Sequence, residues 1–217
     1  MIGLDRDEGI WTVTIDRPEK ANSLTHDMLS QLASIAEDAQ QARAFILTGR
    51  GKVFSAGADL EEARAGLAVS DVWERLSSAI AALPGISIAA LNGTMAGGAM
   101  GMGLACDLRI AVPSAKFFYP AIKLGFLPQP SDPPRMAKLI GPARTKLILL
   151  AGQKIDASEA FAFGLVDRIV EPDALIDTAR SLAQDCCAAP RDIASGIKEM
   201  CAVSEVVPRA GAVLPRR

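Results

Sequence analysis

The sequence is poor in the residue types that most often carry metal-binding and nucleophilic chemistry. Its 217 residues include one histidine, His26, and four cysteines, Cys106, Cys186, Cys187 and Cys201, which show no CxxC spacing. Zinc sites and Cys/His or Ser/His triads are therefore not expected, and no metal site is predicted. Reduced thiols fit a cytoplasmic protein best.

Long apolar runs and an excess of charge of one sign are also missing. No apolar run approaches the roughly 20 residues that a membrane span needs, and residues 1–7 do not resemble a leader peptide. The chain has 23 basic and 25 acidic residues, and the basic ones are scattered. Neither nucleic acid nor a membrane is therefore expected as a partner.

What the sequence does contain is a large apolar fraction in short, regularly spaced runs. Hydrophobic residues make up 50% of the chain, which predicts one globular domain with a sizeable core. Strands are indicated over residues 11–16, 44–49, 86–91 and 108–112, helices over 25–42, 72–82, 143–150, 157–163 and 192–201, and proline-rich loops over 114–134. Thr25 is a suitable N-cap for the first helix. Strands that alternate with helices indicate an α/β fold with one layered core.

The glycine-rich run at residues 97–103 follows a predicted strand and the Asn92-Gly93 turn. Each glycine inside a helix costs about 1 kcal/mol relative to alanine, so these glycines need a reason. Glycines between a strand and a helix let another group approach the backbone amides. Such amides would best bind an anionic ligand or a developing oxyanion. Nucleotide binding is a weaker interpretation, because the run lacks the GxGxxG spacing.

A second entry from a strand into a helix, residues 53–60, also has a central glycine, Gly57. A carbonyl oxygen that gains negative charge accepts two hydrogen bonds from different directions, so it is best held by donors from separate segments. The amides of Ala58 and Gly98 can supply one donor each. The two segments together predict an oxyanion hole.

Several further motifs occur in a fixed order along the chain. They are residues 15–24, 54–59, 92–98, 106–111, 124–128 and 162–167. With these motifs the sequence resembles the crotonase, or enoyl-CoA hydratase/isomerase, superfamily over about residues 10–200. Because all the motifs occur in one collinear order, the resemblance is specific.

The resemblance implies an α/β fold, a crotonase-like spiral of repeated ββα units with a shortened C-terminal helical region. The spiral core is expected over residues 1–190, and a truncated helix and tail over 191–217. The resemblance also implies an acyl-CoA thioester as substrate, with no permanently bound cofactor, and a homotrimer or hexamer. The thioester carbonyl would be held by the amides of Ala58 and Gly98. Residues that would lie along the coenzyme A are Lys20, Ala21, Ala56, Gly57, Asp59 and Leu60.

The sequence departs from the family pattern at both acid/base positions. Hydratases of this family carry a glutamate where this chain has Gly101, and a second glutamate where it has Ala121. Another position used in some members holds Gln129, which cannot act as a base. Two-glutamate hydration is therefore not expected. Decarboxylation or thioester cleavage, which rely more on the oxyanion hole, is the leading hypothesis; the alternative is an inactive acyl-CoA-binding or assembly protein.

The candidate proton-transfer groups that remain are Asp132 and Tyr119. Asp132 lies in a proline-rich segment that is stiff enough to hold a carboxylate in place, so it is the candidate base. The competing and favoured interpretation is that Asp132 caps a helix that begins near Pro133. Tyr119 is more often a packed aromatic than an acid. Asp59 and Asp107 are interpreted chiefly as capping or structural partners.

Overall fold

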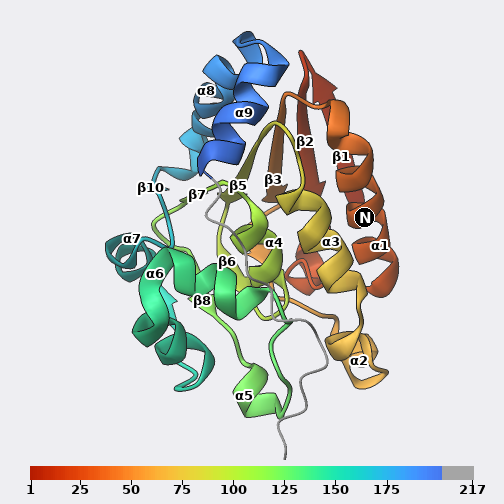
Figure 1. The fold of residues 1–217 in the computed structure, drawn as a ribbon. Helices are drawn as coiled ribbons and strands as arrows, with labels where there is room; N and C mark the ends of the chain where they lie inside the picture. Colours follow the sequence, from red (N-terminus) through yellow and green to blue (C-terminus); the bar gives the residue numbers. More distant parts are fainter. Residues whose placement is uncertain (202–217) are drawn as a thin grey trace, which may run out of the picture.

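The computed structural model describes residues 1–201, which form two β-sheets flanked by helices (Figure 1). The larger sheet contains, in spatial order, β1 (Ile2–Asp7), β2 (Ile10–Ile15), β3 (Ala44–Gly49), β5 (Ile86–Leu91), β7 (Leu108–Ala111) and β10 (Arg168–Ile169). The smaller sheet contains β4 (Val53–Ser55), β6 (Thr94–Ala96), β8 (Lys116–Phe118) and β9 (Ile155–Asp156). The helices are α1 (His26–Asp38), α2 (Leu60–Arg64), α3 (Val72–Ala81), α4 (Ala99–Ala105), α5 (Ala121–Leu124), α6 (Asp132–Leu149), α7 (Ala157–Phe163), α8 (Leu175–Ala188) and α9 (Arg191–Cys201).

The two sheets are built from one repeating unit. A strand of the larger sheet is followed by a strand of the smaller sheet and then by a helix, as in β3-β4-α2, β5-β6-α4 and β7-β8-α5. Strands β3, β5 and β7 pair in parallel with one another, and so do β4, β6 and β8. The spiral of ββα units that the resemblance implies is therefore confirmed.

Burial explains why the central strands were readable from the sequence. All six residues of β3 are buried, as expected for a parallel strand that is covered on both faces. Helix α1 packs its apolar stripe against α3, and the side chain of Thr25 accepts a hydrogen bond of 3.2 Å from the amide of Met28. The N-cap prediction is confirmed.

Some elements differ from the sequence-based expectation. Strand β1 was not expected, because most of its residues are exposed at the sheet edge and show no apolar alternation. Residues 114–134 are loop-rich as expected, but they also hold β8, α5 and the first residues of α6, which were not predicted. Helix α8 was also missed. The helix expected at 143–150 is the second half of α6, which is interrupted at Gly141 with a φ of 76°.

The C-terminal helix expected at residues 192–201 is confirmed as α9. The tail expected after it lies outside the described residues. Within residues 1–201, no helix has the length and apolar character needed to cross a membrane.

Candidate active site

The two glycine-containing segments lie side by side where the neighbouring strands β4 and β6 end. Gly57 has a φ of 91°, and a Cβ atom built on it would lie 2.8 Å from the carbonyl oxygen of Ala96. A Cβ atom built on Gly97 would lie 3.8 Å from the Cα atom of Gly57. The glycines therefore let the two backbones approach each other closely. Ala58 and Gly98, the next residues along each segment, come from adjacent stretches of chain.

The backbone around Ala58 turns the Ala58 amide away from the segment that contains Leu24. The Leu24 amide donates to the Gly57 carbonyl, and the Asp59 amide donates to the Leu24 carbonyl, each at 2.8 Å. Because amides alternate in direction along an extended strand, the N–H of Ala58 points to the opposite side. Within residues 1–201, neither this amide nor that of Gly98 donates a hydrogen bond. Two half-buried donors from separate segments are thus available to a ligand.

The carboxyl group of Asp132 lies against Gly101, one turn along α4 from Gly98. A Cβ atom built on Gly101 would lie only 2.6 Å from Asp132 Oδ1. Asp132 is 0% exposed, and its Oδ2 accepts a hydrogen bond of 2.9 Å from the hydroxyl of Tyr119. Its Oδ1 has no hydrogen-bond partner among the described residues. Asp132 therefore occupies the space that a side chain at position 101 would fill.

The surroundings of Asp132 favour its protonated form. Burial raises the pKa of Asp132 to about 7, and the charge of Glu74 adds to this rise, whereas Tyr119 and Arg135 oppose it. Burial and the nearby Asp132 also raise the pKa of Tyr119, which stays a protonated hydrogen-bond donor. A carboxyl group that titrates near neutral pH can both take up and release a proton.

The segment before Asp132 is held in place by α3. The Glu74 carboxylate accepts hydrogen bonds from the Ser131 amide at 3.1 Å and from its hydroxyl at 2.8 and 2.9 Å. The same hydroxyl accepts a hydrogen bond of 2.8 Å from Arg135 Nη1. The Gln129 amide donates to the Tyr119 hydroxyl oxygen at 3.3 Å. These contacts fix the backbone on either side of the buried carboxyl group.

Replacing Glu74 with glutamine should lower the pKa of Asp132, because it removes a negative charge that raises this pKa while it keeps an acceptor for Ser131. Infrared titration of the protonated carboxyl band measures the midpoint directly. The matched control is Glu37→Gln, which removes an exposed carboxylate bonded to Arg75 and should leave that midpoint unchanged. An unchanged midpoint in Glu74→Gln would contradict the electrostatic account.

The structure bears on the interpretation of Asp132 as a helix cap. Ser131 is the N-cap of α6 without a capping hydrogen bond from its side chain, and the Asp132 side chain bonds Tyr119 instead. The favoured interpretation of Asp132 as a helix cap was therefore wrong. The reason is that this carboxyl group points into the protein against α4 rather than back toward the amides of its own helix.

The other two aspartates have the structural roles expected of them. Asp59 is the N-cap of α2, and a hydrogen bond from Arg17 lowers its pKa. Asp107 accepts hydrogen bonds from the amide and hydroxyl of Ser87, and it forms an ion pair with Lys198 at 2.8 Å.

The residues expected along the coenzyme A lie near one exposed edge of the glycine segments. The Ala56 amide donates to the Ala21 carbonyl at 3.0 Å, which brings the Lys20-Ala21 turn against the second glycine segment. Lys20 and Ala56 are exposed, and Leu60 is 73% exposed at the start of α2. Coenzyme A binding by these residues stays a prediction.

Sequence reasoning missed the contribution of α3. Trp73 covers Gly98, because a Cβ atom built on this glycine would lie 3.0 Å from the indole ring. The indole nitrogen donates to the Leu67 carbonyl at 2.9 Å, which fixes the ring. The helix itself was predicted, but packing of α3 on α4 is a tertiary contact that leaves no motif in the sequence.

The family model described as enoyl-CoA hydratase/isomerase matches residues 5–208. The chain belongs to the enoyl-CoA hydratase/isomerase family. It is 36% identical over 191 residues to the "Probable enoyl-CoA hydratase echA8" of Mycobacterium bovis, covering 83% of this chain and 72% of that protein. It is 32% identical over 196 residues to the 1,2-epoxyphenylacetyl-CoA isomerase of Escherichia coli, covering 85% of this chain and 75% of the other.

Solved structures agree with this family membership. The crystal structure of an enoyl-CoA hydratase from Bacillus anthracis superimposes with a TM-score of 0.83 at 32% identity. The match covers 91% of this chain and 81% of that one. The chain therefore has the crotonase fold. Acyl-CoA processing is the activity of the family to which it belongs.

Proposed function

We propose that this protein stabilises the enolate or oxyanion of an acyl-CoA thioester with the amides of Ala58 and Gly98. Both amides are half-buried, come from adjacent segments and donate no hydrogen bond within residues 1–201. Donors that are already oriented stabilise negative charge as it develops, without a reorganisation penalty. Coenzyme A enters as part of the substrate, so the proposal needs no permanently bound cofactor.

Asp132 is the proposed proton-transfer group, and its position against Gly101 is the observation that carries this proposal. The family pattern places a glutamate at position 101, on the same helix as the Gly98 amide. In this chain the carboxyl group comes from the start of α6 and fills the same space. With a pKa near 7, Asp132 can remove a proton from the thioester α-carbon or return one to an enolate. Tyr119 positions the carboxyl group through its hydrogen bond.

A single carboxyl group restricts the reaction. Water addition needs one group to activate water and another to protonate the α-carbon, and the second family glutamate is replaced by Ala121. Decarboxylation of a β-carboxyacyl-CoA needs only hydrogen-bond donors that stabilise the enolate and one group that protonates it. The proposed reaction class is therefore decarboxylation, with thioester cleavage as the related reaction that the same amides can support.

The alternative function is acyl-CoA binding without catalysis. The observation that favours it is the complete burial of Asp132, together with the cover that Trp73 places over Gly98. A substrate must gain access to a carboxyl group that is 0% exposed. An inactive binding protein would bind acyl-CoA tightly, turn over no thioester and be unaffected by Asp132→Ala.

Parallel assays of three coenzyme A thioesters separate these functions. We expect turnover of a β-carboxyacyl-CoA or a simple acyl-CoA and little hydration of crotonyl-CoA, each followed by mass spectrometry. Efficient hydration of crotonyl-CoA would contradict the conclusion drawn from the missing glutamates. Tight binding without turnover of any thioester would favour the binding protein.

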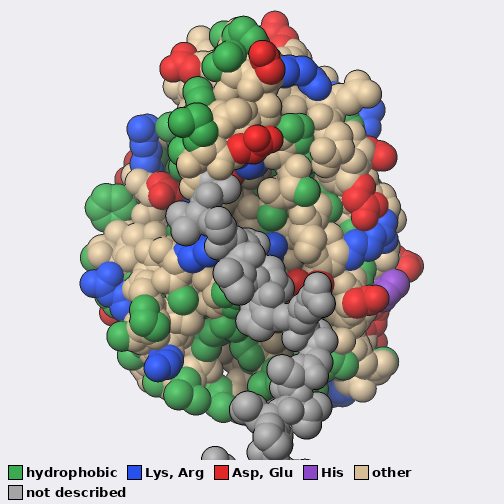
Figure 2. All heavy atoms as spheres, in the orientation of Figure 1, with side chains coloured by type: hydrophobic (Ala, Val, Ile, Leu, Met, Phe, Trp, Pro, Cys, Tyr) green, Lys and Arg blue, Asp and Glu red, His purple; other side chains and the backbone are tan. Residues whose placement is uncertain are grey.

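The proposed assembly is a homotrimer or hexamer. Hydrophobic side chains gather on the lower part of the face shown in Figure 2, near α5. Exposed residues there are Ile122, Leu124, Phe126 and Leu127. Exposed apolar patches of this kind often mark interaction surfaces. Sedimentation velocity tests the oligomeric state.

A further inference from the structure

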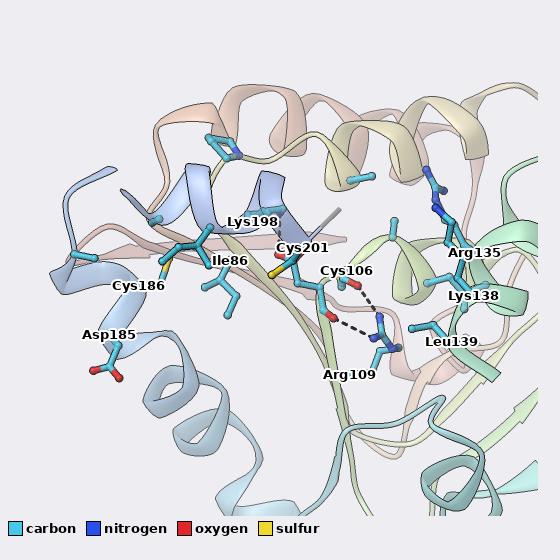
Figure 3. Close-up of a pocket in the computed structure, with 18 residues that line it drawn as sticks. Ile86, Cys106, Arg109, Arg135, Lys138, Leu139, Asp185, Cys186, Lys198 and Cys201 are labelled. Carbon is cyan, nitrogen blue, oxygen red and sulfur yellow. Dashed lines mark hydrogen bonds and ion pairs between the residues drawn. The ribbon is translucent and has the colours of Figure 1, made fainter. Parts of the chain in front are cut away.

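A cavity of about 730 Å³ lies beneath α9, apart from the proposed active-site residues. None of Ala58, Gly98, Tyr119 and Asp132 lines it. Arg135, Lys138 and Leu139 of α6 stand on one side, and Lys198 and Cys201 of α9 on the other (Figure 3). A volume of this size is typical of small-molecule sites, which range from about 300 to 1,000 Å³.

The walls of the cavity are amphipathic with an excess of positive charge. Its apolar lining includes Ala81, Pro84, Ile86, Leu104, Ala105, Leu139, Ala194 and Ile197. Four basic and two acidic residues also line it. Lys198 is paired with Asp107, and Arg109 is hydrogen-bonded to backbone carbonyls and to Asp167. The charge of Lys198 and the hydrogen-bond donors of Arg109 are therefore already matched within the protein.

Arg135 is a second buried arginine in this lining, beside Arg109. It is only 8% exposed, and its Nη1 donates to the Ser131 hydroxyl at 2.8 Å. No hydrogen bond from its Nε or Nη2 to another residue of the described chain is found. A guanidinium group has five N–H donors and stays charged, so a buried one normally meets a carboxylate or several oxygens. The remaining N–H donors of Arg135 can therefore take an anionic partner.

We propose that this cavity binds an amphipathic monocarboxylate, with its carboxylate on Arg135 and its hydrocarbon chain along the apolar wall. Guanidinium and carboxylate groups form charge-assisted and often bidentate hydrogen bonds. Because the cavity shares no residue with the oxyanion amides, the proposal does not rest on the proposed reaction.

Isothermal titration calorimetry of the full chain with sodium decanoate tests the proposal. We expect one site per chain, with decan-1-ol and decyltrimethylammonium binding at least tenfold more weakly. Arg135→Gln should weaken decanoate binding about tenfold to a hundredfold, and Arg135→Lys should restore part of the loss, because charge-assisted hydrogen bonds are stronger than neutral ones. Equal binding of the alcohol and the carboxylate would overturn the assignment to Arg135.

A pair of variants separates this cavity from the proposed active site. Ala194→Trp places a large side chain in the cavity from α9, a helix with no buried residue, so the rest of the fold should be retained. It should abolish decanoate binding, whereas Gly98→Ala, which presses on Trp73, should leave it intact. The reverse pattern would place the ligand in the active site and overturn the proposal. The proposal would also be overturned if the protein formed a stable oligomer that did not bind decanoate. That result would assign the cavity to contact with a second copy of the chain.

Discussion

Replacing Asp132 with asparagine should lower the turnover of acyl-CoA substrates by about 10²- to 10⁴-fold, the usual range for loss of a general acid/base. Asparagine keeps an acceptor for the Tyr119 hydroxyl but cannot transfer the proton. Binding of the acyl-CoA should change little, because the oxyanion amides are untouched. Steady-state kinetics on the variant and on the exposed control Asp173→Asn measure this effect. Unchanged turnover in the Asp132 variant would show that Asp132 is not the proton-transfer group.

The same substitution should stabilise the protein at alkaline pH. The pKa of Asp132 is about 7 in the folded protein and 3.8 in the reference state, so the folded state holds this proton more tightly. The resulting stabilisation is complete below the unfolded pKa and is lost as pH rises through the folded pKa. A shift of about three units corresponds to roughly 4 kcal/mol.

Denaturant unfolding at pH 5 and pH 8 measures this linkage. Wild type should lose stability between the two values, and Asp132→Asn should lose much less. A variant that is inactive yet more stable at pH 8 separates a functional carboxyl group from a structural one. If Asp132→Asn were less stable at both pH values, the buried carboxylate would be a structural element of the fold.

The second large effect, on stability, is expected from placing a carboxyl group at position 101 of α4. Gly101→Glu alone should be strongly destabilising, because even its Cβ atom would lie 2.6 Å from Asp132 Oδ1 and two carboxyl groups would share one buried site. Overpacking by itself costs about 1–3 kcal/mol. The double variant Gly101→Glu/Asp132→Gly removes the clash and should recover most of the loss.

A double-mutant cycle measures this compensation, because residues that share one space give effects that do not add. Gly196→Ala serves as control for a glycine within a helix, since its Cβ atom would meet nothing within 4 Å, and it should raise stability by up to about 1 kcal/mol. The double variant should also regain part of the turnover that Asp132→Gly alone loses. Additive destabilisation in the cycle would show that Asp132 and position 101 do not compete for the same space.

The sequence located the two glycine segments that the structure brings together, because their strand-to-helix turns are local features of the chain. Gly57, Ala58, Gly97 and Gly98 follow short buried strands, and parallel pairing of β4 and β6 brings their ends together. The absence of glutamate at positions 101 and 121 could also be read directly, because each position lies at a fixed distance from a motif, three residues after Gly98 and three residues before Leu124. That absence alone could not show that another residue fills the space.

Tertiary packing decided what the sequence could not. Asp132 before Pro133 has the local signature of a helix cap, and only the approach of α6 to α4 turns its side chain onto Gly101. Glu74 lies on a helix face that would ordinarily meet solvent, yet its carboxylate holds Ser131. Both roles depend on side chains far apart along the chain, for which a single sequence contains no local pattern.

Deuterium incorporation at C2 of butyryl-CoA in D₂O tests most directly whether an oxyanion hole and a single carboxyl group act together on a thioester. Mass spectrometry follows the exchange for wild type and for Asp132→Asn. We predict exchange by wild type, with a rate that rises as pH passes through about 7 while Asp132 loses its proton, and little exchange by the variant at any pH. Equal exchange by both proteins, or none by wild type while butyryl-CoA is bound, would contradict the account.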